Sequence, residues 1–150
     1  MLNRYGQFSY AISRISRSIQ KIDRDEMVKY GFRGAFAQYL LALNSHPDGL
    51  TSVQLSEICD KDRAAISRIV SEMEEKGLVV RESVSDNMYR ALIRLTDEGR
   101  RAADFVHARA VPAIAAAGKG LTDENRRIFY EALDLIAANL EKICRDGIPD

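Results

Sequence analysis

The sequence lacks the features that mark membrane and exported proteins. No run of 18 apolar residues is present, although hydrophobic residues make up 46% of the chain, so no membrane-spanning helix is expected. The N-terminus also lacks the charged and then apolar order of a signal peptide. At 150 residues the chain is long enough to bury a real core. We therefore expect a cytoplasmic protein with one domain.

Residues suited to metal binding and catalysis are scarce. The chain has two cysteines, Cys59 and Cys144, and two histidines, His46 and His107, and none of the four has a partner at metal-ligand spacing. No nucleophile-base arrangement, phosphate-binding glycine loop or paired carboxylate motif stands out. We expect no enzymatic activity, no metal and no cofactor. The separated cysteines fit a reducing compartment.

The chain also lacks an excess of charge of one sign. It contains 22 basic and 22 acidic side chains, which gives a net charge of zero. Residues 1–33 carry seven basic and three acidic side chains, whereas residues 51–100 carry eight basic and ten acidic ones. Proteins that bind nucleic acid over their whole surface are strongly basic. Any DNA-binding surface must therefore be a local patch.

The stretch from 50 to 96 is the most informative part of the sequence. Thr51 and Gln54 have the spacing of a capping box, which predicts the start of a short helix. Leu55 and Ile58 should form its single apolar stripe. The residues from 59 to 61 have no apolar period and lie where a tight turn is needed before a second helix.

The second helix of this stretch should have one apolar and one polar face. Its residues at inward spacing are Ile66, Ile69, Val70 and Met73, and those pointing outward are Arg63, Ser67, Arg68, Ser71 and Glu72. Asp62 is expected to cap this helix, and Gly77 to end it. A short, polar and basic outer face suits a helix that enters the DNA major groove, because Arg can bond two acceptors of guanine.

A two-stranded ribbon should follow this helix. Residues 78–84 form one expected strand, residues 85–88 a turn, and residues 89–95 a second strand in which apolar residues alternate with Arg90 and Arg94. The order of helix, turn, helix and ribbon predicts a winged helix-turn-helix with a mainly α fold.

Three motifs in this region resemble the MarR family of bacterial transcriptional regulators. They are Gly49-Leu50-Thr51, the run from Asp62 to Arg81, and Leu95-Thr96-Asp97-Glu98-Gly99. The resemblance implies a homodimeric, sequence-specific regulator, expected to be a repressor, that binds an inverted repeat in double-stranded DNA. We expect the DNA contacts on Arg63, Ala64, Ser67, Arg68 and Ser52, with Arg90 or Arg94 on the wing.

Both ends of the chain carry apolar residues at four- and three-residue spacing. The N-terminal set is Phe8, Ile12, Ile15, Ile19 and Ile22 on a helix from Gln7 to about Lys29, and the C-terminal set is Phe129, Leu133, Ile136, Leu140 and Ile143. Such seams can pack on a partner chain or within the same chain. We expect residues 1–29 and 97–150 to form a dimerisation layer and residues 30–96 to form the DNA-binding region.

Aromatic residues are dense in the first 40 positions. The resemblance implies that a small aromatic or anionic effector binds between the dimerisation layer and the DNA-binding region. The candidate effector-binding residues are Tyr5, Tyr10, Tyr30, Arg33 and Phe36. Aromatics at helical spacing are more often part of the core.

Two other interpretations compete with a DNA-binding regulator. One is a winged helix that binds a protein instead of DNA, which fits the zero net charge and a wing tip in which Asp86 precedes Arg90 by four positions instead of the family's two. The other is a thiol-based redox regulator that acts through Cys59. The acidic neighbours Asp60 and Asp62 argue against the second, since they should raise the pKa of the thiol.

Overall fold

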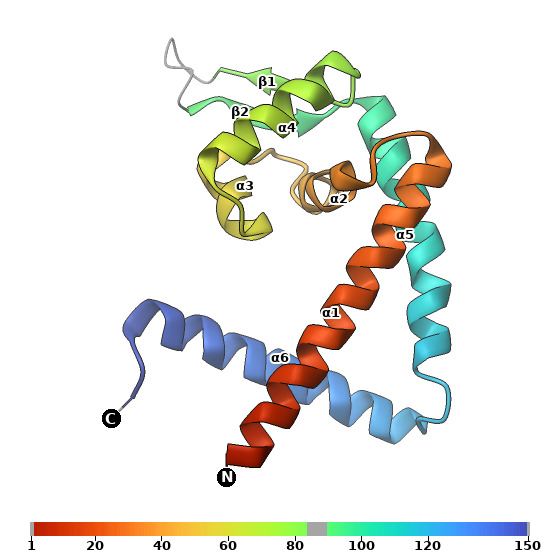
Figure 1. The fold of residues 1–150 in the computed structure, drawn as a ribbon, viewed down its shortest axis with the longest axis vertical. Helices are drawn as coiled ribbons and strands as arrows, with labels where there is room; N and C mark the ends of the chain where they lie inside the picture. Colours follow the sequence, from red (N-terminus) through yellow and green to blue (C-terminus); the bar gives the residue numbers. More distant parts are fainter. Residues whose placement is uncertain (1, 84–89, 150) are drawn as a thin grey trace. The chain divides into compact units, whose positions relative to one another are not determined.

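The computed structural model describes residues 2–83 and 90–149. Residues 1–112 form one compact unit and residues 113–150 a second. The helices are α1 (Leu2–Tyr30), the short 3-10 helix η1 (Gly34–Phe36), α2 (Ala37–Asn44), α3 (Ser52–Cys59), α4 (Arg63–Glu75), α5 (Asp97–Ala117) and α6 (Asp123–Asp146), and the strands are β1 (Val79–Glu82) and β2 (Leu92–Leu95). The mainly α fold with a small wing sheet is confirmed (Figure 1). No helix among the described residues is long and apolar enough to cross a membrane.

Helix α1 begins at Leu2, five residues before its predicted start, and ends at Tyr30, one residue after its predicted end near Lys29. Gly31 ends it in a left-handed conformation at φ +111°, and its amide donates to the carbonyl oxygens of Met27 and Val28. The apolar seam of α1 changes character along the helix. Phe8, Ile12 and Ile15 are exposed, whereas Ile19 and Ile22 are partly buried.

The segment after α1 is less regular than the sequence suggests. The spacing predicts a single helix with Phe32, Phe36, Leu40 and Leu43 on one face, and for Phe32 this is wrong, because it lies before η1. Its ring still packs against the core from a partly buried position. Phe36, Leu40 and Leu43 are buried on η1 and α2 as expected.

Helix α3 starts with the predicted capping box. The Gln54 amide donates to Thr51 Oγ1 at 3.2 Å, and the Thr51 amide donates to Gln54 Oε1 at 2.9 Å. Leu55 is fully buried, but the prediction for Ile58 is wrong, because this side chain is 50% exposed. The half-buried Cys59 packs against the core in its place. An eight-residue helix has few inward positions, and one step in register changes which residue fills them.

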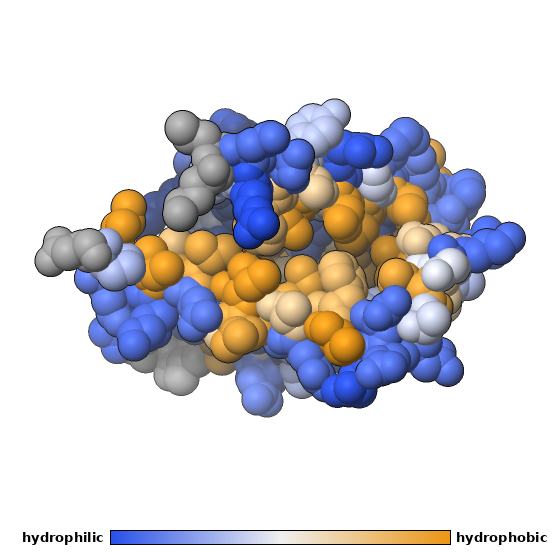
Figure 2. Space-filling view, turned by 90° about the horizontal axis from the view of Figure 1, so that it is seen from below, coloured by the Kyte–Doolittle hydropathy of each residue, from blue (hydrophilic) through white to orange (hydrophobic). Residues whose placement is uncertain are grey.

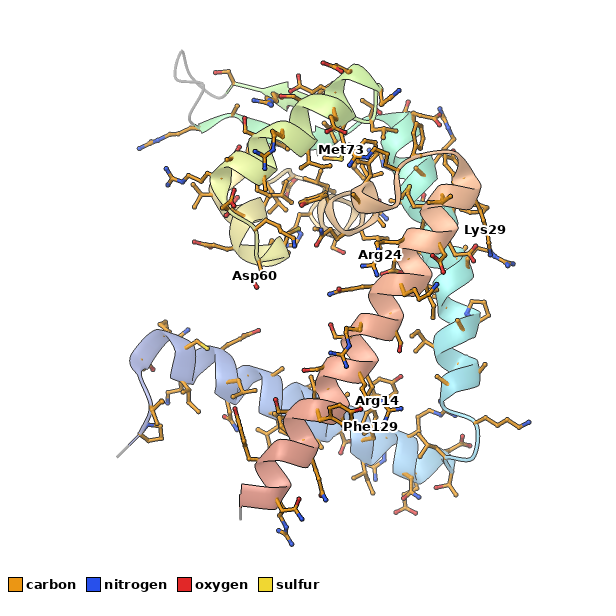
Figure 3. All side chains as sticks on the ribbon, in the orientation of Figure 1. Arg14, Arg24, Lys29, Asp60, Met73 and Phe129 are labelled. Carbon is orange, nitrogen blue, oxygen red and sulfur yellow. The ribbon has the colours of Figure 1, made fainter. Side chains whose placement is uncertain are left out.

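Helix α4 supplies much of the core. Ile66, Ile69, Val70 and Met73 are buried as predicted, and Met73 lies on the inner side of the helix (Figure 3). Gly77 follows the helix at φ +73° and allows the chain to turn toward β1. The amide of Leu78 then donates to the Met73 carbonyl at 2.9 Å, which is the bonding pattern of a Schellman motif.

The wing sheet is antiparallel, with Val79 paired to Leu95 and Glu82 paired to Leu92. Both strands are shorter than predicted, and the expected turn at 85–88 lies outside the described residues. Leu50 adds an isolated bridge that the sequence did not suggest. It exchanges two backbone hydrogen bonds with Ile93, at 3.0 and 2.7 Å.

Helix α5 starts against the end of α4. Thr96 Oγ1 accepts a hydrogen bond from the Gly99 amide at 3.1 Å, as expected for a cap. A Cβ atom on Gly99 would lie 2.0 Å from the Leu78 carbonyl oxygen, so only glycine allows this approach. Pro112 lies inside α5 and does not divide it.

The unit formed by residues 113–150 contains the end of α5 and the whole of α6. The sequence predicts that Thr122, followed by Asp123 and Glu124, starts the last helix, and Thr122 does cap α6, accepting from the Asn125 amide at 3.1 Å. None of the residues of α6 is buried. Its predicted seam is present but open, and Phe129 and Leu140, for example, are 42% and 48% exposed. Figure 2 shows one face of the molecule, on which orange marks the residues of high hydropathy.

Candidate nucleic-acid interface

The candidate interface is built on the exposed face of α4. The Asp62 side chain accepts from the Ala65 amide at 2.7 Å and fixes the first turn of the helix. The four predicted contact residues on this helix, Arg63, Ala64, Ser67 and Arg68, are all exposed. They lie on the side opposite to the buried residues, because i and i+4 positions share a helix face. The structure therefore brings these four together on one surface.

The two arginines of this surface are available for a partner. Among the residues that the structure describes, neither Arg63 nor Arg68 forms an ion pair or a side-chain hydrogen bond. The side chains of Ala64 and Ser67 beside them are small, so they do not hinder the close approach of a partner to the helix. A guanidinium can therefore reach a base edge or a phosphate oxygen without first breaking a polar contact to any residue within 2–83 or 90–149.

The second half of α4 is acidic, but two of its carboxylates have partners. Arg33, which precedes η1, forms an ion pair with Glu72, and Arg81 of β1 forms one with Glu74. Arg81 also donates to Ser71 Oγ at 3.3 Å. These contacts reduce the negative field near the basic end of the helix, although partly exposed pairs are worth only about 0–1 kcal/mol each.

The roles of Arg33 and Arg81 on α4 were not predicted from the sequence. Arg33 lies 39 positions from Glu72, so no helical spacing connects them. The predicted register of the first wing strand could have indicated the contact of Arg81, because β1 follows α4 directly in the chain.

Ser52 and the wing arginines occupy different places. Ser52 is the exposed first residue of α3, where free backbone amides suit a phosphate oxygen. Arg90 is exposed where the described chain resumes before β2. Arg94 pairs with Val80 in the ladder, on the sheet face opposite to Val79 and Arg81. Because Arg81 contacts α4, Arg94 faces away from that helix and does not join the α4 surface.

The five candidate effector-binding residues do not lie together. Tyr5 and Tyr30 are at opposite ends of α1, about 38 Å apart at a helical rise of about 1.5 Å per residue. Tyr5 and Tyr10 are exposed, and the Tyr10 ring is covered by the Arg14 guanidinium at 5.6 Å. Phe36 is a core residue.

The remaining two effector candidates have partners of their own. Tyr30 donates to Glu98 Oε1 at 3.3 Å, and its ring lies 5.1 Å from that of Phe105. Arg33 lies over the Phe36 ring at 5.8 Å and pairs with Glu72. One copy of the chain therefore does not assemble these five residues into a single pocket.

Cys59 lies at the end of α3, close to the turn before α4. Its pKa is raised to about 11, because the half-buried thiol is poorly solvated, and Lys61 opposes this shift. The expected direction is confirmed, but the expected cause is wrong: burial raises the pKa, and the neighbouring aspartates are not responsible. Cys144 is exposed on α6.

A family model and one curated relative match this chain in sequence. The MarR family model matches residues 30–87. An uncharacterised HTH-type transcriptional regulator of Bacillus subtilis, YdgJ, is 27% identical over 104 residues, which are 69% of this chain and 63% of that protein. The match thus spans less than two thirds of this relative.

Solved structures share the fold over nearly the whole chain. A MarR family regulator from Listeria monocytogenes, solved with a 26-mer DNA, has a TM-score of 0.75 at 20% identity and covers 94% of this chain and 96% of its own. CouR from Rhodococcus jostii RHA1, bound to p-coumaroyl-CoA, has a TM-score of 0.67 at 23% identity, with 95% of both chains covered. The MarR family model thus matches the central region of this chain, and solved structures of MarR family regulators share its winged helix-turn-helix fold.

Proposed function

We propose that this protein is a transcriptional regulator that binds double-stranded DNA through the exposed face of α4. The observation that carries the proposal is a capped helix whose outer face presents Arg63 and Arg68, without partners among the described residues, beside Ala64 and Ser67. Arg can bond guanine in a bidentate manner, and Ser can bond a base edge or a phosphate. Ser52 and Arg90 extend this surface in the proposal, and Arg94 is left out of it.

The proposed assembly is a homodimer on an inverted repeat. The apolar seams of α1 and α6 support it, because Phe8, Ile12, Phe129 and Leu140 are all exposed in the single chain. Exposed apolar stripes of this length usually mark a surface for a partner. A two-fold dimer places its recognition helices about one DNA turn apart, roughly 34 Å, and so reads two half-sites. The residues of 1–29 and 97–150 would form this layer.

Repression relieved by a small molecule is the proposed mode of action. Because the recognition helices of a dimer must match two successive major grooves, a ligand that changes their spacing by a few ångströms prevents one helix from entering its groove. The CoA thioester in the CouR structure supports an aromatic or anionic effector. Tyr5, Tyr10, Tyr30, Arg33 and Phe36 would contribute to such a site only if a second copy brought them close, since they are spread along α1 and η1.

A gel shift against the DNA upstream of the gene tests this proposal. Many regulators of this kind control their own promoter, so the wild-type protein should bind that DNA tightly. Arg63→Ala and Arg68→Ala should each weaken binding, because a bidentate pair of hydrogen bonds to guanine is worth about 1–3 kcal/mol. Arg127→Ala is the matched control, because Arg127 is exposed and its ion pair within the described part of the chain is with Glu131 on α6. Unchanged binding by both α4 variants would contradict the proposal.

A protein-interaction module is the second candidate function. The zero net charge favours it, because a DNA-binding surface usually lies in a positive field. Absence of any shift on DNA at low salt, for a protein shown to be dimeric, would support this candidate. A thiol-based switch at Cys59 has less support, since a pKa of about 11 leaves little reactive thiolate near neutral pH.

A further inference from the structure

A polar pocket of about 260 Å³ lies beside the base of the wing, away from the α4 surface. It is lined by Leu43, Asn44, Pro47, Val80, Glu82, Arg94, Leu95 and Arg100. These residues come from the end of α2, the turn after it, both wing strands and the first turn of α5. All of them belong to the unit formed by residues 1–112. The pocket is slightly smaller than most ligand sites, so it suits a compact molecule.

Two guanidinium groups line this pocket, those of Arg94 and Arg100, and both have unused bonding capacity. Arg94 is held by its stem, whose Cγ packs closely against Gly49. Its Nη1 lies 3.3 Å from the Glu82 carboxylate, which is long for a charge-assisted contact. Its Nε is buried and has no hydrogen-bond partner within the described chain. A buried donor without a partner is costly, so a small shift of the Arg94 side chain that gives this Nε an acceptor is favoured.

Arg100 supplies the second positive charge from α5. It is 54% exposed and forms an i,i+3 pair with Asp97 at 3.0 Å, so most of its donors remain available. The acidic groups near the pocket are already engaged: Asp97 with Arg100, Asp104 with Asn44 at 3.1 Å, and Glu82 with Arg94. An incoming anion therefore competes mainly with Glu82. This carboxylate is 53% exposed and returns to water at little cost.

We propose that this pocket binds a small polar anion, with a carboxylate or phosphate group held between Arg94 and Arg100 in place of Glu82. The planar fork of a guanidinium matches both of these groups. Because the ligand would contact both wing strands and α5, it would fix the base of the wing. Its binding does not depend on the proposed DNA-binding function.

Isothermal titration calorimetry without DNA tests the site, with sodium phosphate and sodium citrate as probes and sodium chloride of equal ionic strength as the reference. We expect saturable binding of at least one probe. Arg94→Gln and Arg100→Gln should each raise its Kd about tenfold. Glu82→Gln should lower the Kd several-fold, because it removes the competing carboxylate. Arg127→Gln, far from the pocket in sequence and paired on α6, should leave the Kd unchanged.

The two probes distinguish the possible ligand classes, and the variants decide whether the proposal holds. Binding of phosphate alone indicates a phosphorylated ligand, and binding of citrate alone indicates a carboxylic acid. Arg100→Gln keeps the test valid if Arg94→Gln fails to fold, since Arg100 is largely exposed. The proposal is overturned if neither probe binds above the chloride reference, or if Arg100→Gln and Glu82→Gln bind as the wild type does. A gel shift on the same preparations reports DNA binding separately.

Discussion

Gly99 shows how a single residue can set the contact between two elements. Its missing side chain lets the first turn of α5 approach the carbonyl of Leu78, where a Cβ atom would be 2.0 Å from the oxygen. Gly99→Ala should therefore destabilise the protein by about 1–3 kcal/mol or more in urea denaturation, because backbone must shift. Gly6→Ala is the control, since no atom lies within 4 Å of the added group. That variant should be neutral or more stable by up to about 1 kcal/mol, and equal effects of the two would contradict this reasoning.

The thiol of Cys59 is expected to react slowly with thiol reagents, because it is half-buried. Its pKa is raised to about 11 by burial, so the reactive thiolate forms only as the pH approaches that value. In native protein near neutral pH, Cys59 in a Cys144→Ser variant should react with a thiol reagent much more slowly than Cys144 in a Cys59→Ser variant. As long as the pH is below the pKa, the reaction rate of Cys59 should rise about tenfold for each unit by which the pH is increased. A rapid, pH-independent reaction of Cys59 would show that the site opens readily.

At the scale of single residues, prediction from the sequence succeeded where the determining contact is local. The caps at Thr51, Asp62 and Thr122 involve an amide three positions away, so spacing alone identifies them. Ile58 failed because the core contact depends on how a short helix packs. Arg94 could not be placed from sequence, because its position depends on Gly49 and Glu82 in other parts of the fold.

Helix α4 depends on Asp62 for its N-terminal turn. The side chain accepts from the Ala65 amide at 2.7 Å. Asp62→Ala should therefore cost about 0.5–2 kcal/mol of stability and also loosen the turn that carries Arg63. Asp62→Asn, which retains a capping oxygen, should lose much less. Thermal unfolding of the three proteins measures this, and similar losses in both variants would show that the charge, and not the cap, matters.

Whole elements were predicted well when they were long and periodic. The apolar faces of α1, α4 and α6 followed from spacing alone, and the glycine that ends α4 followed from its position. Both strands were predicted to be longer than they are. The Leu50 bridge was missed, because the pairing of a single residue leaves no period in the sequence. The helix predicted from Phe32 to Leu43 is divided into η1 and α2, and we identify no sequence signal for this division.

The molecule as a whole should be a dimer held by its apolar seams. Leu140→Glu would place a charge on the exposed seam of α6, whose side chains are otherwise open to water in the single chain. We expect it to shift the protein toward monomer in size-exclusion chromatography with light scattering, because a buried unpaired charge is costly. Ala138→Glu, on the opposite face of the same exposed helix, should leave the dimer intact. A monomeric wild type would contradict the proposed assembly.

The most direct measurement of DNA binding through α4 is fluorescence anisotropy with upstream duplex DNA over a series of salt concentrations. The wild type should bind with a negative slope of log K against log salt, because phosphate contacts release counterions. Arg63→Ala and Arg68→Ala should weaken binding, each by about 2–6 kcal/mol per dimer because each substitution removes two guanidinium groups, while Arg127→Ala should not. Wild-type binding with the same affinity and slope in both α4 variants would show that this surface does not contact DNA.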